Sequence, residues 1–199
     1  MQRRYKEMQL HNHFPTAILE HQVCSSLADT VEQELIDHIN VLPYEKAFKG
    51  NVATDYYNET QTRIDIFNMF PDLITEFFNA KNNYQTSTGI EASDNISYWT
   101  QDYRDETGIH TKHHHGVDGI SGVYWVRANE HAAPIKFYNP NTLLGYVEAK
   151  DLDNPYRSMS SVYMPVKGKM LLFPSFLQHE VLPSQAGVIR TTIAFNFLQ

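Results

Sequence analysis

The chain has 199 residues, a formal net charge of −7, and 42% apolar and 13% aromatic residues. This length and composition suit one folded domain with a hydrophobic core and exclude a disordered chain. The lysine and arginine residues are scattered and form no basic stripe, so a nucleic acid is not an expected partner.

Cysteine usage and the N-terminal sequence suggest where the protein resides. The single cysteine, Cys24, rules out an internal disulfide and fits a reducing compartment. The basic start of the chain is followed by no unbroken apolar stretch, so neither a signal peptide nor a membrane span is expected. We therefore expect a cytoplasmic protein without membrane association.

The first ninety or so residues predict helices. Apolar residues at helical spacing predict one helix over Ser25–Ile39, with a serine cap at its start and Pro43 closing it. A second helix is predicted over Pro71–Lys81, with proline in its first turn and an apolar buried side. The polar residues 82–89 predict a loop.

From Ile96 onward, the pattern changes to short strands separated by Gly, Pro and Asn. The predicted strands are Ile96–Gln101, Ile120–Val126, Ile135–Tyr138, Leu144–Val147, Ser158–Met164, Lys169–Phe173, His179–Leu182 and Ile189–Phe197. Such a series predicts a mainly β jelly roll or small barrel, not a βαβ sheet. We expect a single domain over 1–199, in which a helical layer (about 1–90) packs on the barrel (about 91–199).

The histidines of the chain are clustered. Four of the ten lie between His110 and His115, just before an apolar strand-like run. In extended backbone His113 and His115 share a face, whereas His114 faces away. His179 follows a buried-strand pattern much later in the chain. Neutral imidazole binds Zn, Fe, Cu or Ni, so a metal site formed by His113, His115 and His179 is predicted. A solvated histidine patch is the alternative.

An arginine follows the last of these histidines. On the predicted strand Ile189–Phe197, Arg190, Thr192 and Ala194 share one face. An arginine that faces into an apolar barrel needs an anion, because an unpaired buried charge is very costly. Its planar fork suits a carboxylate, and the Thr192 hydroxyl would add a third hydrogen bond. The alternative is a structural salt bridge to Glu180 or Asp118.

Several motifs occur in a characteristic order: His113-His-His, Ser121-Gly-Val-Tyr, Pro165-Val-Lys-Gly, His179-Glu-Val, and Arg190 before Ile-Ala-Phe-Asn-Phe. Over about 96–197 this order resembles the Fe(II)/2-oxoglutarate-dependent dioxygenase superfamily, especially its small prolyl-hydroxylase-like members. The resemblance implies a double-stranded β-helix, which is a cupin-like jelly roll. It also implies a hydroxylase that uses Fe(II), 2-oxoglutarate and O2 to oxidise a C–H bond of a peptide, prolyl residues included, or of a small molecule.

The resemblance also implies roles for residues around the cosubstrate. Arg190 would pair with the far carboxylate of 2-oxoglutarate, with Thr192 at the neighbouring hydroxyl position. Tyr103 falls where relatives place a tyrosine that hydrogen-bonds the cosubstrate, and Trp125 falls at an aromatic position beside it. Simple barrel lining is the alternative for both aromatic residues.

The metal ligands depart from the superfamily pattern. The resemblance implies that His113 and His179 bind iron, but it calls for His-X-Asp or His-X-Glu, and this chain has neither. By register His115 takes the place of the carboxylate. There are two alternatives for the third ligand position: Asp118 in the following loop fills it, or no protein ligand fills it. A neutral His115 leaves the centre one charge unit more positive than a carboxylate would, which alters redox potential and metal preference.

Two other function classes remain open at the level of sequence. One is a cupin-like dioxygenase that uses three histidines and no 2-oxoglutarate. For that enzyme a buried Arg190 would have no purpose. The other is a non-catalytic β-barrel binding module whose histidines hold a structural ion, in which protein ligands would close the coordination sphere.

Overall fold

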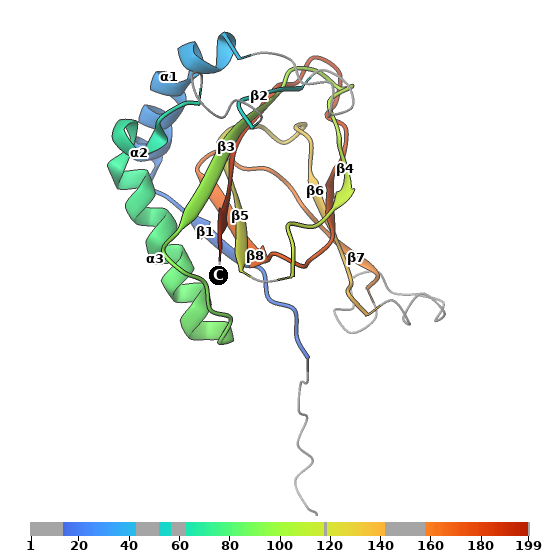
Figure 1. The fold of residues 1–199 in the computed structure, drawn as a ribbon. Helices are drawn as coiled ribbons and strands as arrows, with labels where there is room; N and C mark the ends of the chain where they lie inside the picture. The colour runs from blue at the N-terminus through green and yellow to red at the C-terminus, as the bar shows by residue number, and fades with distance from the viewer. Residues whose placement is uncertain (1–13, 43–51, 57–62, 118, 142–157, 199) are drawn as a thin grey trace, which may run out of the picture.

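The computed structural model describes residues 14–42, 52–56, 63–117, 119–141 and 158–198. Two antiparallel sheets face each other, and the helices cover the outer face of the larger sheet (Figure 1). The helices are α1 (Ser25–Asn40), α2 (Ile66–Met69) and α3 (Pro71–Thr88). The strands are β1 (Leu19–Gln22), β2 (Val52–Thr54), β3 (Ile96–Tyr103), β4 (His110–His113), β5 (Ile120–Arg127), β6 (Ile135–Tyr138), β7 (Ser160–Tyr163), β8 (Lys169–Pro174), β9 (His179–Val181) and β10 (Arg190–Phe197).

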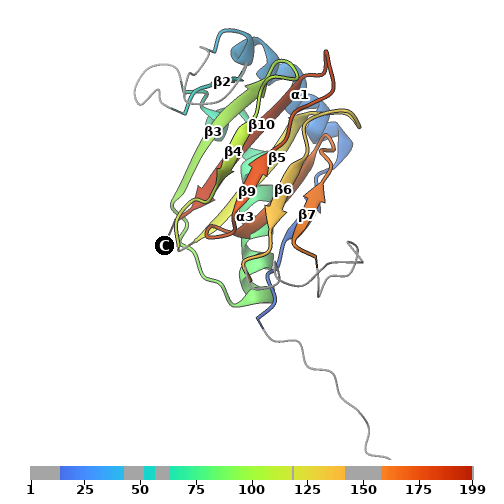
Figure 2. The same cartoon turned by 90° about the vertical axis from the view of Figure 1, so that its right-hand side faces the viewer.

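The larger sheet has the strand order β1-β8-β5-β10-β3-β2, and the smaller sheet has the order β4-β9-β6-β7. Figure 2 shows the smaller sheet in front of the larger one. The predicted mainly β architecture, with N-terminal helices packed on the barrel, is confirmed. Strand β10 lies between β5 and β3, so its inner face is central to the space between the two sheets.

The two faces of β10 have different partners because side chains alternate along a strand. Ile193, Phe195 and Phe197 join the core under the helices, where Phe195 stacks on Phe77 of α3 at 4.2 Å between ring centroids. Arg190, Thr192, Ala194 and Asn196 occupy the opposite face, which is directed between the sheets. The smaller inner core is built from Val123, Trp125, Ile135, Phe137, Leu171, Phe173 and Leu177.

Helix α1 is confirmed, but its predicted serine cap is wrong. Ser25 is the first helical residue, the N-cap position belongs to Cys24, and no side chain caps the helix there. The helix ends at Asn40. Pro43, which was expected to close it, lies outside the described residues. Packing of the apolar stripe, with Val31 and Leu35 fully buried, holds this helix in place.

Helix α3 is longer than predicted, because the polar segment 82–88 continues it. Tyr84 is buried on the helix and donates a hydrogen bond to the Ala17 carbonyl at 3.0 Å. Gly89 ends the helix in the left-handed conformation (φ 72°), which glycine adopts without strain. The polar composition that predicted a loop therefore belongs to the solvent face of the last helical turns.

Most predicted strands are present with shifted ends, and three strands were missed. The predicted strand Leu144–Val147 lies outside the described residues. Strands β1 and β2 are short edge strands, which carry a weak alternation signal. Strand β4 contains the polar sequence His-Thr-Lys-His, which has no apolar period to reveal it.

That residues 1–199 make a single domain stays a prediction. No helix in the described ranges is long and apolar enough to cross a membrane.

Gly122 on β5 is required by close packing. A Cβ atom there would approach the Phe195 ring to 2.2 Å. We expect Gly122→Ala to lower the free energy of unfolding by about 1–3 kcal/mol, because the ring must move out of its stack on Phe77. Urea unfolding measures this change. In a Phe195→Leu background the same substitution should cost less, and an equal cost in both backgrounds would contradict this explanation.

Candidate active site

Two of the predicted ligands form a cross-strand pair. His113 ends β4 and lies directly opposite His179, the first residue of β9. Their ring centroids are 4.3 Å apart. Opposed residues on neighbouring antiparallel strands place their side chains on the same face. The pairing of β4 with β9 therefore brings together two histidines that are far apart in the sequence.

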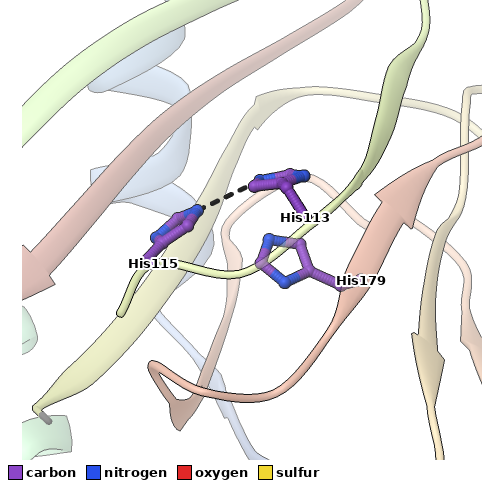
Figure 3. A group of neighbouring side chains, drawn as sticks. All are labelled: His113, His115 and His179. Atoms are coloured by element: carbon purple, nitrogen blue, oxygen red, sulfur yellow. Dashed lines mark hydrogen bonds between the residues drawn. The ribbon is translucent and has the colours of Figure 1, made fainter. Parts of the chain in front are cut away.

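His115 lies elsewhere than the sequence suggested. It does not share a strand with His113 but lies two residues beyond the end of β4, in the connection to β5. Gly116, at φ 118°, follows it. Its ring nevertheless turns toward the other two, with centroids 5.1 Å from His113 and 5.0 Å from His179 (Figure 3). The three imidazoles thus converge, although only two of them are held by strand pairing.

Each of the three rings is oriented by a hydrogen bond from its Nδ1 atom. The acceptors are the Thr111 carbonyl for His113 (2.7 Å), the Leu177 carbonyl for His179 (2.9 Å) and the Asn196 side-chain oxygen for His115 (2.7 Å). Carbonyl oxygens only accept, so the proton of each neutral ring is on Nδ1. Every Nε2 atom is then left with a free lone pair, which is the form that binds a metal.

The spacing of these nitrogen atoms fits a metal ion. The Nε2 atoms of His113 and His115 are 3.1 Å apart, and the potential ligand atoms of all three histidines lie within 4.8 Å of one another. Two unprotonated nitrogens at this distance repel unless a cation lies between them. Two metal–imidazole bonds of about 2.0–2.1 Å at right angles would place their nitrogens about 3.0 Å apart. The residues therefore fit a divalent metal.

Burial keeps these histidines neutral. Desolvation lowers the pKa of His179 to about 2 and the pKa of His113 to about 4, and it also lowers the pKa of His115. Positive charge on neighbouring histidines would depress these pKa values further. At neutral pH the three rings therefore present lone pairs to an incoming cation and carry no charge of their own.

Acid should destabilise the metal-free protein through these groups. An unfolded histidine takes up a proton near pH 6.5, whereas folded His179 stays neutral to about pH 2. Its contribution to stability is thus complete above about pH 6.5 and is lost as the pH falls, with a slope of up to about 1.4 kcal/mol per pH unit. Urea unfolding between about pH 7 and 5 should show a shallower slope for His179→Asn. If His179→Asn and the wild type lost stability with the same slope, His179 would not be the group responsible. His114 is exposed, so His114→Asn is the control.

Arg190 is buried at the inner face of the larger sheet. Its side chain is 1% exposed, and its guanidinium carbon lies 4.9 Å from the Tyr103 ring centroid and 6.0 Å from that of Trp125. Burial lowers its pKa to about 10, so the group stays charged at neutral pH. Glu180, one alternative partner, instead accepts a hydrogen bond from Tyr138. Asp118, the other alternative, lies outside the described residues.

Unpartnered polar atoms surround this guanidinium. Within the described part of the chain, Nε and Nη1 of Arg190 find no hydrogen-bond partner, and the same holds for Thr192 Oγ1, Trp125 Nε1 and Gln101 Nε2. Thr192 lies opposite Gln101 on β3 and opposite Trp125 on β5, so these groups share one face of the sheet. Buried polar groups are rarely left unpaired, because each costs about 1–3 kcal/mol. The cluster therefore fits an anionic ligand with several acceptor atoms.

The anion cluster lies on the face of β10 to which His115 is also hydrogen-bonded. Arg190 and Thr192 stand at one end of that face, and Asn196, which accepts from His115, stands at the other. His110 stacks on His113 at 3.8 Å between ring centroids. Burial, followed by the charges of His113, His115 and Arg190, lowers the pKa of His110 to about 3. His110 therefore lies within electrostatic reach of both groups.

Two other residues considered in the sequence, Tyr103 and His114, differ in their burial. Tyr103 is fully buried, and its hydroxyl donates a 3.4 Å hydrogen bond to Gln101 Oε1. His114 is exposed and does not face the cluster. Sequence reasoning gave no role to Gln101 or Asn196. The same alternation that placed Thr192 beside Arg190 extends to Asn196, so a signal for that residue was present.

Comparison with known proteins points to one family. Residues 97–196, half of the chain, match the family model described as "Putative 2OG-Fe(II) oxygenase", where 2OG denotes 2-oxoglutarate. No curated protein matches the chain in sequence.

Solved structures resemble the chain across most of its length. A prolyl-4-hydroxylase from Pseudomonas putida has a TM-score of 0.66 at 12% identity, over 92% of this chain and 93% of that one. A prolyl hydroxylase from Trichoplax adhaerens, in complex with a peptide fragment of hypoxia inducible factor, has a TM-score of 0.58 at 14% identity, over 92% and 82%. HygX from Streptomyces hygroscopicus, with nickel, 2-oxoglutarate and hygromycin B bound, has a TM-score of 0.58 at 9% identity, over 91% and 82%. Such likeness shows the fold, and it confirms the predicted double-stranded β-helix.

Proposed function

Because this chain belongs to the 2OG-Fe(II) oxygenase family, whose members use Fe(II) and 2-oxoglutarate, we propose that it is a dioxygenase that hydroxylates a C–H bond of its substrate. One observation carries the proposal: three imidazoles with free Nε2 atoms converge in front of the face of β10 that carries a buried arginine, whose Nε and Nη1 atoms are unpaired within the described residues. Metal ligation and anion binding at adjacent sites are what this chemistry needs.

His113, His115 and His179 would hold Fe(II) through their Nε2 atoms. Two histidines and one carboxylate are the usual protein ligands of non-haem Fe(II) oxygenases, and they leave positions open for other ligands. Here His115 takes the third protein position, so all three ligands are neutral and the ion keeps its full charge. The higher positive charge favours binding of an anionic cosubstrate.

Arg190 and Thr192 would hold the far carboxylate of 2-oxoglutarate. Within the described residues, the Nε and Nη1 atoms of Arg190 are unpaired and available to donate to a carboxylate, and Thr192 Oγ1 would supply a further hydrogen bond. Trp125 Nε1 is a further unpaired donor on the same face, and Tyr103 packs against the guanidinium. These two aromatic residues would also exclude water from the buried arginine, which strengthens its attraction for the anion.

Fe(II) and 2-oxoglutarate, when bound with O2, supply oxidative decarboxylation that yields succinate and CO2 and oxidises a substrate C–H bond. The residues of this chain contribute binding and orientation. His113, His115 and His179 would hold the ion, and Arg190 on the larger sheet would hold the cosubstrate. The buried arginine and the partly buried histidines would keep the reaction away from bulk water, where a reactive oxidant would attack other partners.

For the substrate we propose a peptide, with a prolyl residue as the first candidate, or a small polar molecule. The similar structures include prolyl hydroxylases from Pseudomonas putida and Trichoplax adhaerens, the latter with a peptide, and HygX with hygromycin B. The net charge of −7 favours a neutral or basic substrate. We expect the loop 128–133 to border the pocket mouth, and we expect the same of residues 142–157, which lie outside the described residues.

The proposal is tested by following oxygen and succinate together. Purified protein with Fe(II), 2-oxoglutarate and ascorbate should consume O2 and form succinate in equal amounts, slowly without substrate and faster with a suitable one. A survey of prolyl peptides and polar small molecules then narrows the substrate. Oxygen use that does not depend on 2-oxoglutarate would favour the cupin-like alternative, and metal binding without any oxygen use would favour a binding module.

A further inference from the structure

Of the three converging histidines, only His115 has its Nδ1 atom hydrogen-bonded to a side chain. The Nδ1 atoms of His113 and His179 donate to backbone carbonyls, whereas the Nδ1 atom of His115 donates to the side-chain oxygen of Asn196 at 2.7 Å. His113 and His179 also lie on paired strands, but His115 lies in a connection beyond β4. The orientation of its ring therefore depends on contacts outside the smaller sheet.

A closed ring of hydrogen bonds supplies those contacts. The backbone N–H of His115 donates to the Ser175 carbonyl at 2.9 Å, and the Ser175 hydroxyl lies 2.8 Å from the Ser121 hydroxyl. Ser121 donates to the Asn196 oxygen at 2.7 Å, and that oxygen also accepts from the His115 ring. Ser121 and Ser175 are 0% and 2% exposed, so solvent does not compete for the bond between their hydroxyls.

This ring of hydrogen bonds connects His115 to the larger sheet. Ser121 is on β5, Asn196 is on β10, and Ser175 directly follows β8, which are three neighbouring strands. One amide oxygen has two lone pairs, and here each accepts from a donor, so movement of the oxygen away from His115 would break both hydrogen bonds. The third ligand is thereby fixed to the opposite sheet from the other two.

We propose that Asn196, held by Ser121, is the positioning residue that keeps His115 in the Nδ1–H tautomer with its Nε2 atom directed at the metal position. This inference rests on the proposed function, since it assigns the neutral third ligand in place of the carboxylate. An outer hydrogen-bond partner of a metal-bound histidine fixes its tautomer and raises its basicity. Because the amide is uncharged, His115 remains a neutral ligand.

Two substitutions of similar size separate positioning from packing. Asn196→Leu fills the same space but accepts no hydrogen bond, so His115 is free to rotate or to adopt the Nε2–H tautomer. We expect Co(II) affinity, measured by anaerobic absorption titration, to fall by about 10–100-fold, as for other outer-shell partners. Asn196→Asp keeps the acceptor and adds negative charge, so it should bind Co(II) at least as tightly as the wild type. Ser121→Ala should weaken binding less than Asn196→Leu does.

The tautomer itself gives a readout that needs no metal. Long-range 1H–15N spectra of the metal-free wild type should show His115 protonated at Nδ1, whereas those of Asn196→Leu should show an Nε2–H population. Urea unfolding checks that each variant folds. If Asn196→Leu does not fold, Ser121→Ala provides the same comparison in milder form.

The outcomes distinguish this inference from the proposed function. Wild-type Co(II) affinity and an unchanged His115 tautomer in a folded Asn196→Leu protein would overturn the positioning role. A wild-type protein that binds no Co(II) would overturn the proposed function instead. In that case the spectra of the metal-free protein would still decide whether Asn196 sets the tautomer.

Discussion

Replacing Arg190 with methionine is expected to weaken 2-oxoglutarate binding by about 2–5 kcal/mol, which corresponds to roughly 30-fold to several thousand-fold in affinity. The guanidinium is 1% exposed, and its Nε and Nη1 atoms find no partner within the described residues. Without the Arg190 guanidinium, the carboxylate of 2-oxoglutarate would be buried next to unpaired polar groups and would lack its charged partner. Calorimetric titration of the anaerobic Fe(II)-loaded protein with 2-oxoglutarate measures the loss.

The same substitution should not destabilise the cosubstrate-free protein. A buried charge without a partner opposes folding, and methionine fills a similar volume without that cost. We therefore expect the free energy of unfolding of Arg190→Met to equal or exceed that of the wild type in urea. Loss of 2-oxoglutarate affinity without loss of stability would indicate that Arg190 serves to bind the ligand and not to stabilise the fold.

Arg127 offers a matched control on the other face of the same sheet. It bonds to Asp102 and Thr191, away from the histidines. Arg127→Met should lower stability, because it breaks a hydrogen-bonded ion pair to a buried carboxylate, and it should leave 2-oxoglutarate affinity unchanged. Equal affinity of Arg190→Met and the wild type for 2-oxoglutarate would reject the anion site.

Replacing His113 with alanine is expected to reduce Fe(II) affinity by more than about 100-fold. Loss of an outer hydrogen-bond partner alone costs about 10–100-fold, and a direct ligand contributes more. His113 and its partner His179 supply the two ligands that strand pairing fixes, and their ring centroids are 4.3 Å apart. Anaerobic competition between the protein and a chelator of known affinity measures the change.

The adjacent His114 provides the control for this experiment. It is exposed and lies outside the group of potential ligands. His114→Ala should therefore bind Fe(II) as the wild type does. If the two alanine variants lost affinity equally, the histidine segment would act as a loose metal-binding patch, and the defined site would be refuted.

The sequence predicted which residues lie together better than it predicted their local geometry. Alternation along a strand correctly placed Arg190 and Thr192 on one inward face, because β10 is a long central strand with a regular period. The same rule failed for His115. Strand β4 ends at His113, and His115 is held by tertiary hydrogen bonds that it donates to the Ser175 carbonyl and the Asn196 side-chain oxygen. Sequence periodicity carries no information about such long-range contacts.

The fold was predicted best where apolar periodicity is strong. Strands β5 and β8 are buried throughout most of their length and were predicted nearly to their ends. The last turns of α3 were missed because their solvent face is polar, although Tyr84 anchors them to Ala17. Edge strand β2 has three residues, too few to reveal a period of two.

The central claim is that the three histidines and Arg190 together bind Fe(II) and 2-oxoglutarate. It is tested most directly by adding Fe(II) to the protein without oxygen, before and after 2-oxoglutarate, and recording the visible spectrum. A weak charge-transfer band should develop only when metal, cosubstrate and protein are all present, and it should be absent with His113→Ala. A wild-type spectrum that stays featureless at saturating Fe(II) and 2-oxoglutarate would contradict the account.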